Sequence, residues 1–193
     1  MTKEEAIKII VSTAAVYDEE FKGYNYLYVY DCGGEWHYIE ASYPQKAFMH
    51  LTGVQSDLSP AQFYQRCLDH RLSPKDFDFR TDGTTVLKMN ILPRVFNIRG
   101  TYRMLGIYNN NKPMLYTERI MGGQYCCMGF VHRNQQYCVP NTTLSEDIRD
   151  MVDKAYRIVA VCKKPQHISE YNDCIYRAKG ISEDAVAEFI KKI

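Results

Sequence analysis

Residues 44–53 read Pro44-Gln45-Lys46-Ala47-Phe48-Met49-His50-Leu51-Thr52-Gly53. Pro44 suits the first turn of a helix, where its missing N–H would have no partner in any case. Phe48 and Leu51 then share one apolar side, and Gly53 is expected to end the helix in the left-handed conformation. The short helix therefore presents His50 where chemistry is commonly placed, although a histidine beside Leu51 is equally consistent with core packing.

The residues before this helix predict a longer helix and a hairpin. Thr2 and Glu5 have the spacing of a capping box, and apolar residues recur at helical spacing over 3–17. Tyrosines then alternate with other residues over 24–31, a glycine pair turns the chain, and 35–42 returns as a second strand. We expect an amphipathic N-terminal helix followed by a tyrosine-rich β-hairpin.

The rest of the chain mixes helical and strand patterns. We expect, in order, a helix from Ser59 to about Arg71; a helix over 86–92 that Pro93 interrupts or ends; a hairpin of 102–108 and 114–120 around a turn at 109–113; a hairpin of 124–131 and 136–139 around a turn at 132–135; a short helix over 147–152 with a capping box of Thr143 and Glu146; a strand over 156–162; and a helix from Ser182. These elements predict an α+β fold, in which N-terminal helices pack on an antiparallel sheet of four or more strands. The first hairpin and the C-terminal helix are extra to that sheet.

Length and composition narrow the class of protein. The 193 residues suit a single domain. The 24 basic and 23 acidic residues nearly cancel, so the overall charge does not indicate a nucleic-acid or membrane partner. The seven cysteines include no C-x-x-C pair, and no apolar run approaches the length of a membrane span. We therefore expect a reduced, cytoplasmic protein without a metal site or small-molecule cofactor.

Familiar catalytic signatures are absent, including the P-loop, the dinucleotide fingerprint, H-E-x-x-H and G-x-S-x-G. Five histidines remain as possible acid–base groups: His37, His50, His70, His132 and His167. Only His50 comes with a hydroxyl and a glycine at a segment boundary, whereas His132 falls in a predicted turn. Lys88, three residues after Thr85, is either a cation that stabilises charge on a reacting phosphate or a solvated lysine on an amphipathic helix.

A local cluster of basic residues follows that helix. Arg94, Arg99 and Arg103 lie near aromatic residues, and together with tyrosines of the first hairpin they are compatible with RNA held by phosphate contacts and base stacking. Sheets with tyrosines on a solvated side are also ordinary in proteins that bind no RNA.

The order of these features resembles the fourth group of phage-associated nuclease domains named after barnase, EndoU, colicin and RelE. The resemblance covers about residues 20–165, leaves 166–193 as a C-terminal extension, and rests on Phe48-Met49-His50-Leu51-Thr52-Gly53, Phe63-Tyr64, Cys67, Thr85-x-x-Lys88, Gly129-Phe130, Tyr137-x-x-Pro140-x-Thr142-x-Leu144 and Asp147. The F-x-H-L-T-G element is the distinctive one. The resemblance implies N-terminal helices packed on a four-stranded antiparallel sheet, and a metal-independent ribonuclease carried by phages or other mobile elements.

The implied reaction is attack of the RNA 2′-hydroxyl on the adjacent phosphate. The positions that match the family's motifs offer His50 as the base, Lys88 as the electrostatic stabiliser, and Thr52 and Thr142 as hydrogen-bond donors to the phosphate. Two alternatives remain open. A non-catalytic phage protein on the same scaffold could bind and inhibit a host defence protein, which the near-zero net charge and many tyrosines would suit. A module that binds nucleic acid without cleaving it is the third.

Overall fold

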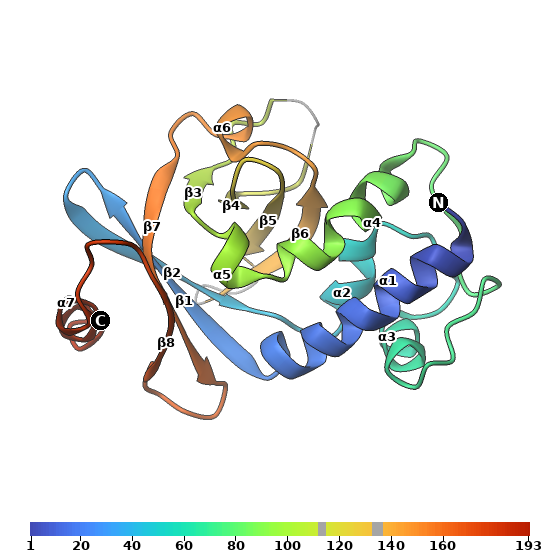
Figure 1. Ribbon diagram of the computed structural model, residues 1–193, viewed down its shortest axis with the longest axis horizontal. Coiled ribbons are helices and arrows are strands. Elements are labelled where there is room, and N and C mark those ends of the chain that lie inside the picture. Colours follow the sequence, from blue (N-terminus) through green and yellow to red (C-terminus); the bar gives the residue numbers. More distant parts are fainter. Residues whose placement is uncertain (112–114, 133–136) are drawn as a thin grey trace.

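The computed structural model of the protein describes residues 1–111, 115–132 and 137–193, which form one mixed α+β unit (Figure 1). The helices of these ranges are α1 (Lys3–Val16), the π-helical turn η1 (Tyr17–Phe21), α2 (Ala47–Thr52), α3 (Pro60–Leu68), α4 (Thr84–Val95), α5 (Ile98–Thr101), α6 (Ile148–Met151) and α7 (Glu183–Ile190). The strands are β1 (Tyr24–Cys32), β2 (Glu35–Ser42), β3 (Met104–Ile107), β4 (Arg119–Gly122), β5 (Cys127–His132), β6 (Cys138–Leu144), β7 (Tyr156–Pro165) and β8 (Asp173–Arg177). The predicted α+β class is confirmed.

The strands pair in the order β1-β2-β6-β5-β4-β3-β7-β8, and β1 also pairs with β7. The sheet therefore closes on itself, with β8 attached outside the ring. Among the residues that the structure describes, the strands pair in antiparallel fashion except at one parallel bridge between Ala41 and Cys138, which joins β2 to β6. The prediction that the tyrosine-rich hairpin is extra to the sheet is wrong, because β1 pairs with β7 along most of its length, from Tyr24 opposite Pro165 to Asp31 opposite Arg157.

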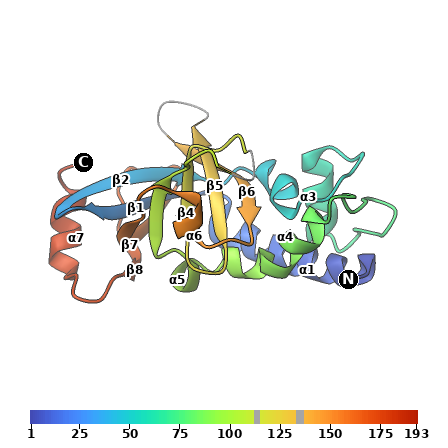
Figure 2. The same ribbon diagram turned by 90° about the horizontal axis from the view of Figure 1, so that it is seen from above.

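Helices α1 to α4 gather at one end of the elongated molecule, and α7 lies at the other end beside β7 and β8 (Figures 1 and 2). The N- and C-termini accordingly lie at opposite ends. Helix α7 begins after Ser182, whose side chain accepts a hydrogen bond from the backbone N–H of Ala185, as the sequence predicts. Its Val186 belongs to a small apolar cluster with Leu27, Val29 and neighbouring residues of β7, so α7 covers the outer side of β1 and β7.

Tyrosines form much of the main core rather than a solvated side of the sheet. Tyr26 and Tyr28 are completely buried, which overturns the expectation that they are available for base stacking. Their hydroxyls have partners inside the protein: Tyr28 and Tyr43 share a hydrogen bond of 2.6 Å, and Tyr26 donates to the backbone carbonyl of Glu20. Because each buried hydroxyl is satisfied, the aromatic rings contribute apolar area without the cost of an unpaired polar group. Tyr38 remains partly exposed.

Local signals mark the helix ends correctly in most places. The capping box of Thr2 and Glu5 is present, and Ser59 forms a second one with Gln62. The capping box predicted for Thr143 and Glu146 is wrong, because Asp147 caps α6 and Thr143 lies buried within β6. Helix α4 continues through Pro93 to Val95 instead of ending at the proline.

The two predicted hairpins around 109–113 and 132–135 correspond to the antiparallel pairs β3–β4 and β5–β6. Their turns fall partly on residues 112–114 and 133–136, which lie outside the described residues. Strand β8 was not predicted. No helix in the described parts of the chain has the length and apolar character needed to cross a membrane.

Candidate active site

Helix α2 ends where the sequence predicts, and Gly53, the residue that follows it, is packed closely against Lys88 of α4. Gly53 adopts φ = 72° and ψ = 10°, the left-handed conformation that glycine tolerates best. A Cβ atom at this position would also lie 2.6 Å from Cδ of Lys88. Gly53 is thus required twice, for the turn and for the close approach of the lysine side chain.

Two buried threonines hold the end of α2 in place. Thr85, in the first turn of α4, donates its hydroxyl to the carbonyl of Gly53 at 2.7 Å and accepts the backbone N–H of Arg80 at 3.0 Å. Thr143, on β6, donates to the carbonyl of Leu51 at 2.9 Å. Each bond satisfies a carbonyl at a helix end that has no partner within the helix. They connect α2 to α4 on one side and to the sheet on the other.

The bonds of Thr85 predict the effect of a substitution. Thr85→Val keeps the volume of the side chain but leaves the Gly53 carbonyl and the Arg80 amide unpaired, so we expect a loss of about 1–3 kcal/mol in the free energy of unfolding. Urea unfolding measures this loss, and Thr85→Ser, which retains the hydroxyl, is the matched control. A valine variant as stable as the serine variant would contradict the assignment.

Thr52 occupies a different position from the one that the phosphate-donor role requires. Its side chain is completely buried, and its hydroxyl donates to the Met49 carbonyl at 2.6 Å. The backbone N–H of Val54 in turn approaches the Thr52 oxygen at 3.4 Å. Since the hydroxyl is used within the turn that ends α2, the structure places Thr52 among the residues that shape the site and away from solvent.

Lys88 and Thr142 lie together, although they are far apart in the sequence. Lys88 Nζ donates to Thr142 Oγ1 at 3.2 Å. The pKa of Lys88 is lowered to about 8, chiefly because the side chain is buried and to a lesser extent because of the nearby charge of Arg80, while Asp82 acts in the opposite direction. The ammonium group is therefore still mostly protonated at neutral pH, but it has lost much of its hydration.

His50 is exposed on α2 and lines a groove of about 620 Å³. The groove runs between α2 and the strands β5 and β6, and its other lining residues are Pro44, Lys46, Ala47, Met49, Pro60, Tyr116, Val131, His132, Val139, Pro140 and Asn141. Two imidazoles thus border one groove. Lys88 and Thr142 are not among the lining residues, so the structure does not place all the predicted site residues in a single cavity.

His132 is held by partners on both of its ring nitrogens. Nδ1 lies 2.6 Å from Oε2 of Glu118, and Nε2 lies 3.3 Å from Sγ of Cys138. The bond from His132 lowers the pKa of Glu118, whereas burial raises the pKa of Cys138 to about 11. Cys138 is therefore a neutral thiol that can donate to Nε2, and the Glu118 carboxylate accepts from Nδ1–H. The contacts use different nitrogens, so the three side chains form a hydrogen-bonded chain.

Sequence patterns do not reveal these hydrogen-bonded side chains, because they belong to different strands or adjoin them. Glu118 precedes β4, His132 ends β5, and Cys138 begins β6. Their spacing of 14 and 6 residues matches no motif, and the pairing of β4, β5 and β6 alone brings them together. The predicted hairpin of 124–131 and 136–139 was the nearest signal, but it places His132 in the turn, whereas in the structure His132 pairs with Cys138.

Asn141 and Thr142 connect the groove to Lys88. They are neighbours on β6 at a register shift in its pairing with β5, where Gly129 lies opposite Thr142. Thr117 donates to Oδ1 of Asn141 at 2.7 Å, and Thr117 and Thr142 both approach Gly129 so closely that a Cβ there would lie within 2.8 Å of each. The glycine allows Thr117 and Thr142 to come close together, and Lys88 reaches the same place through its hydrogen bond to Thr142.

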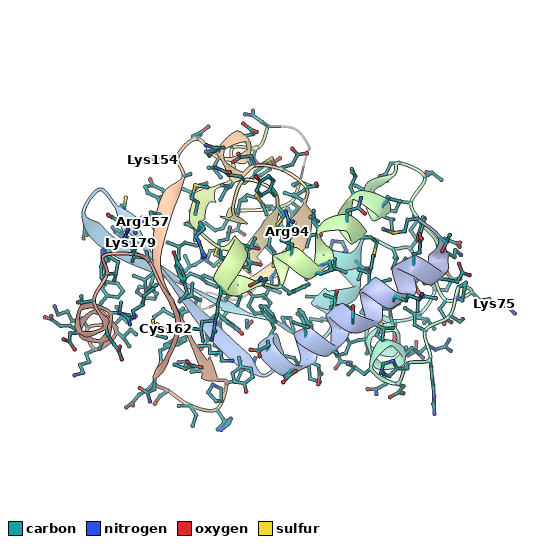
Figure 3. All side chains as sticks on the ribbon, in the orientation of Figure 1. Lys75, Arg94, Lys154, Arg157, Cys162 and Lys179 are labelled. Atoms are coloured by element: carbon teal, nitrogen blue, oxygen red, sulfur yellow. The ribbon has the colours of Figure 1, made fainter. Side chains whose placement is uncertain are left out.

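The three predicted RNA-binding arginines lie elsewhere. Arg94 and Arg103 line a separate pocket of about 270 Å³, and neither borders the groove of His50. Arg94, labelled in Figure 3, lies over the ring of Tyr125 at 5.5 Å, and Arg103 lies over the ring of Tyr176 at 4.3 Å. Arg99 is exposed and lines a different pocket.

The protein is therefore of the mixed α+β class, with a closed and mostly antiparallel sheet and a groove that two histidines border. A family model described as phage-Barnase-EndoU-ColicinE5/D-RelE like nuclease 4 matches residues 9–180. The chain therefore belongs to this nuclease-like family, as the resemblance implied. The match extends beyond the 20–165 expected from the motifs. No curated protein and no solved structure matches the chain.

Proposed function

We propose that the protein is a metal-independent ribonuclease that cleaves RNA by attack of the 2′-hydroxyl on the adjacent phosphate. The observation that carries this proposal is the groove bordered by both His50 and His132. Membership of a nuclease-like family supports the same class of reaction. The groove is large enough for a small part of an RNA chain, and it is open to solvent at His50 and His132, which are both exposed.

Cleavage of this kind needs two proton transfers. One group removes the proton of the attacking 2′-hydroxyl, and a second donates a proton to the 5′-oxygen that leaves. Histidine suits both tasks, because its ordinary pKa of about 6.5 lies near physiological pH. We assign the base to His50, which the family motif contains, and the acid to His132. The exchange is balanced, since the 2′-oxygen–phosphorus bond forms as the phosphorus–5′-oxygen bond breaks.

Glu118 and Cys138 have supporting roles in this assignment. The Glu118 carboxylate accepts from Nδ1 of His132, which orients the ring. Cys138 is 1% exposed and its pKa is raised by burial, which is the reverse of what a nucleophilic thiolate needs. Although Glu118, His132 and Cys138 have the connectivity of a nucleophilic triad, these features favour an acid–base role for His132 over a cysteine-based hydrolysis.

Lys88 supplies positive charge beside the groove. Negative charge grows on the non-bridging phosphate oxygens as the 2′-oxygen attacks, and a partly desolvated ammonium stabilises that charge more strongly than a hydrated one. Thr142, already in contact with Lys88, offers a hydroxyl at the same place. We propose that a phosphate seated near Asn141 meets both groups.

A second RNA contact is proposed at the pocket of Arg94 and Arg103. Tyr125 beside them is 70% exposed, so its ring is available to a base while the guanidinium groups meet phosphates. This pocket would bind RNA outside the groove and contribute affinity without taking part in the chemistry.

The test is cleavage of RNA in the presence of EDTA. We expect purified protein to produce fragments that end in 2′,3′-cyclic phosphate, and to leave an oligonucleotide intact when a single 2′-deoxy nucleotide replaces the one at the cleavage position. His50→Ala should abolish most of this activity. His167→Ala changes an exposed histidine outside the groove and is the matched control. Cleavage that persists in His50→Ala, or that needs a divalent ion, would overturn the proposal.

A further inference from the structure

Two cysteines face each other on the outermost pair of strands. Cys162 on β7 is the direct partner of Cys174 on β8, at a register shift in that pairing. In Figure 3, Cys162 lies where β7 and β8 run side by side, on the opposite side of the molecule from α1 to α4. The pair is remote from the groove of His50 and from the pocket of Arg94, and neither site uses it.

The placement suits a covalent bond between the two sulfur atoms. Directly opposed residues of an antiparallel pair have Cα atoms about 4.5–5.5 Å apart, and disulfides bridge Cα separations of about 4.4–6.8 Å. Both cysteines are free thiols here. A bond could therefore form with small movements of the side chains and without breaking the strand pairing.

The two thiols have different environments. Cys162 is completely buried, whereas Cys174 is half-buried on the outer strand and is the one that a small reagent can reach. A hydrogen bond from Cys162 and the charge of Arg177 lower the pKa of Cys174, and the same hydrogen bond together with burial raises the pKa of Cys162. Cys174 is thus suited to react first, and Cys162 remains a thiol beside it.

We propose that Cys162 and Cys174 form a peroxide-reactive dithiol, in which Cys174 is the attacking sulfur and Cys162 the resolving one. The Cys174 thiolate attacks hydrogen peroxide, the O–O bond breaks, and the sulfur becomes a sulfenic acid while hydroxide leaves. The Cys162 sulfur then attacks the sulfenic sulfur, a disulfide forms, and water leaves. Two thiols and one peroxide become one disulfide and two waters, and a dithiol reductant reverses the change.

The other cysteines provide the contrast. Cys67, Cys126, Cys127 and Cys138 are buried, and burial raises the pKa of each of their thiols. Cys32 is half-buried like Cys174, yet it stands at the end of β1 opposite Glu35 and has no opposed cysteine. If exposure alone decided reactivity, Cys32 and Cys174 would react at similar rates. A faster reaction of Cys174 would therefore show the effect of the neighbouring Cys162.

The experiment treats the full-length reduced protein with hydrogen peroxide at neutral pH and follows it by intact mass and non-reducing peptide mapping. We expect a loss of two hydrogens and a single Cys162–Cys174 linked peptide pair, both reversed by dithiothreitol. Before oxidation, brief alkylation should modify Cys174 several-fold faster than Cys32. This measurement uses the unmodified chain, so it does not depend on whether any variant folds.

Two variants separate the roles of the sulfurs. Cys162→Ser should stop the reaction at the sulfenic acid, which dimedone captures on Cys174, and Cys174→Ser should prevent both capture and disulfide formation at this pair. Cys32→Ser should behave as the parent protein. The proposal is overturned if peroxide leaves Cys162 and Cys174 as thiols, or oxidises Cys174 to sulfinic acid without a disulfide in the unmodified chain. Neither result bears on RNA cleavage.

Discussion

His132→Ala is expected to lower the rate of RNA cleavage by about 10²- to 10⁴-fold, the usual contribution of a general acid or base. The substitution removes the imidazole that Glu118 holds at the groove and leaves His50, which lines the same groove, unchanged. The rate of production of cyclic-phosphate ends from a short RNA measures the effect. Thermal unfolding followed by circular dichroism shows whether the variant is folded.

The pH dependence distinguishes the two histidines. A reaction that needs one neutral and one protonated group has a bell-shaped profile of kcat/KM. If His50 is the base, His50→Ala should remove the dependence on the acidic side, and His132→Ala should remove it on the alkaline side. A His132→Ala variant that keeps the full rate and both limbs would refute the assignment of the acid, while the ribonuclease proposal would stand on His50.

The partners of His132 supply matched controls. Glu118→Gln keeps an oxygen that can accept from Nδ1 but removes the charge, so we expect a smaller loss than for His132→Ala. Cys138→Ala should retain most of the activity, because the thiol contacts Nε2 but takes no part in either of the proposed proton transfers. Complete loss of activity in Cys138→Ala with a folded protein would point to a nucleophilic thiol instead.

Lys88→Met is expected to make the protein more stable at pH 7 and less active. The folded state holds Lys88 with a pKa of about 8, below its ordinary value of 10.5, so folding at neutral pH costs the work of burying a cation. A methionine of similar size avoids this cost, which is at most about 3 kcal/mol from the difference in pKa. Because a positive charge near the phosphate is lost, cleavage should fall at the same time.

The two pKa values of Lys88, in the folded and the unfolded protein, determine how its contribution to stability changes with pH. Between about pH 8 and 10.5 the unfolded chain binds more protons at Lys88 than the folded protein does, so the contribution of this residue to stability rises with pH over that window. The stability advantage of Lys88→Met should therefore be largest below pH 8 and shrink as the pH approaches 10.5. Urea unfolding of both proteins at several pH values measures the difference in their free energies of unfolding. The contributions of titratable groups that both proteins contain drop out of this difference.

Lys75→Met is the control for this comparison. Lys75 is exposed and projects from the end of the molecule near α3 (Figure 3), so its loss should change stability by less than about 0.5 kcal/mol at every pH. If Lys88→Met is less stable than the parent protein at pH 7, then the bond to Thr142 outweighs the cost of burial, and the lysine has a structural role.

Much of the fold follows from short-range patterns. The capping box at Thr2, the proline after Ser59 and the left-handed Gly53 each act within a few residues, and for this reason the helices that they begin or end were placed correctly. Alternation of tyrosines over 24–31 likewise predicted a strand. Alternation shows which side chains share one face of a strand, but it does not show whether that face meets solvent or the core. It therefore did not reveal that Tyr26 and Tyr28 are buried in the core.

The site depended on contacts between distant parts of the chain. His50 was singled out from its own segment, although the sequence left open whether it packs in the core, and the structure exposes it on α2. Lys88 and Thr142 are 54 residues apart and meet because α4 packs on β6. His132 reaches the groove of His50 only because β4, β5 and β6 pair. The pairing of strands also decides that β1 closes the sheet and that Cys162 lies opposite Cys174. Local sequence determines caps, turns and the exposed side of a helix because those energies act within one or two turns. Which residues lie opposite one another across a sheet depends on the register of the strands and on the closure of the sheet. Both depend on contacts between segments that are far apart in the sequence.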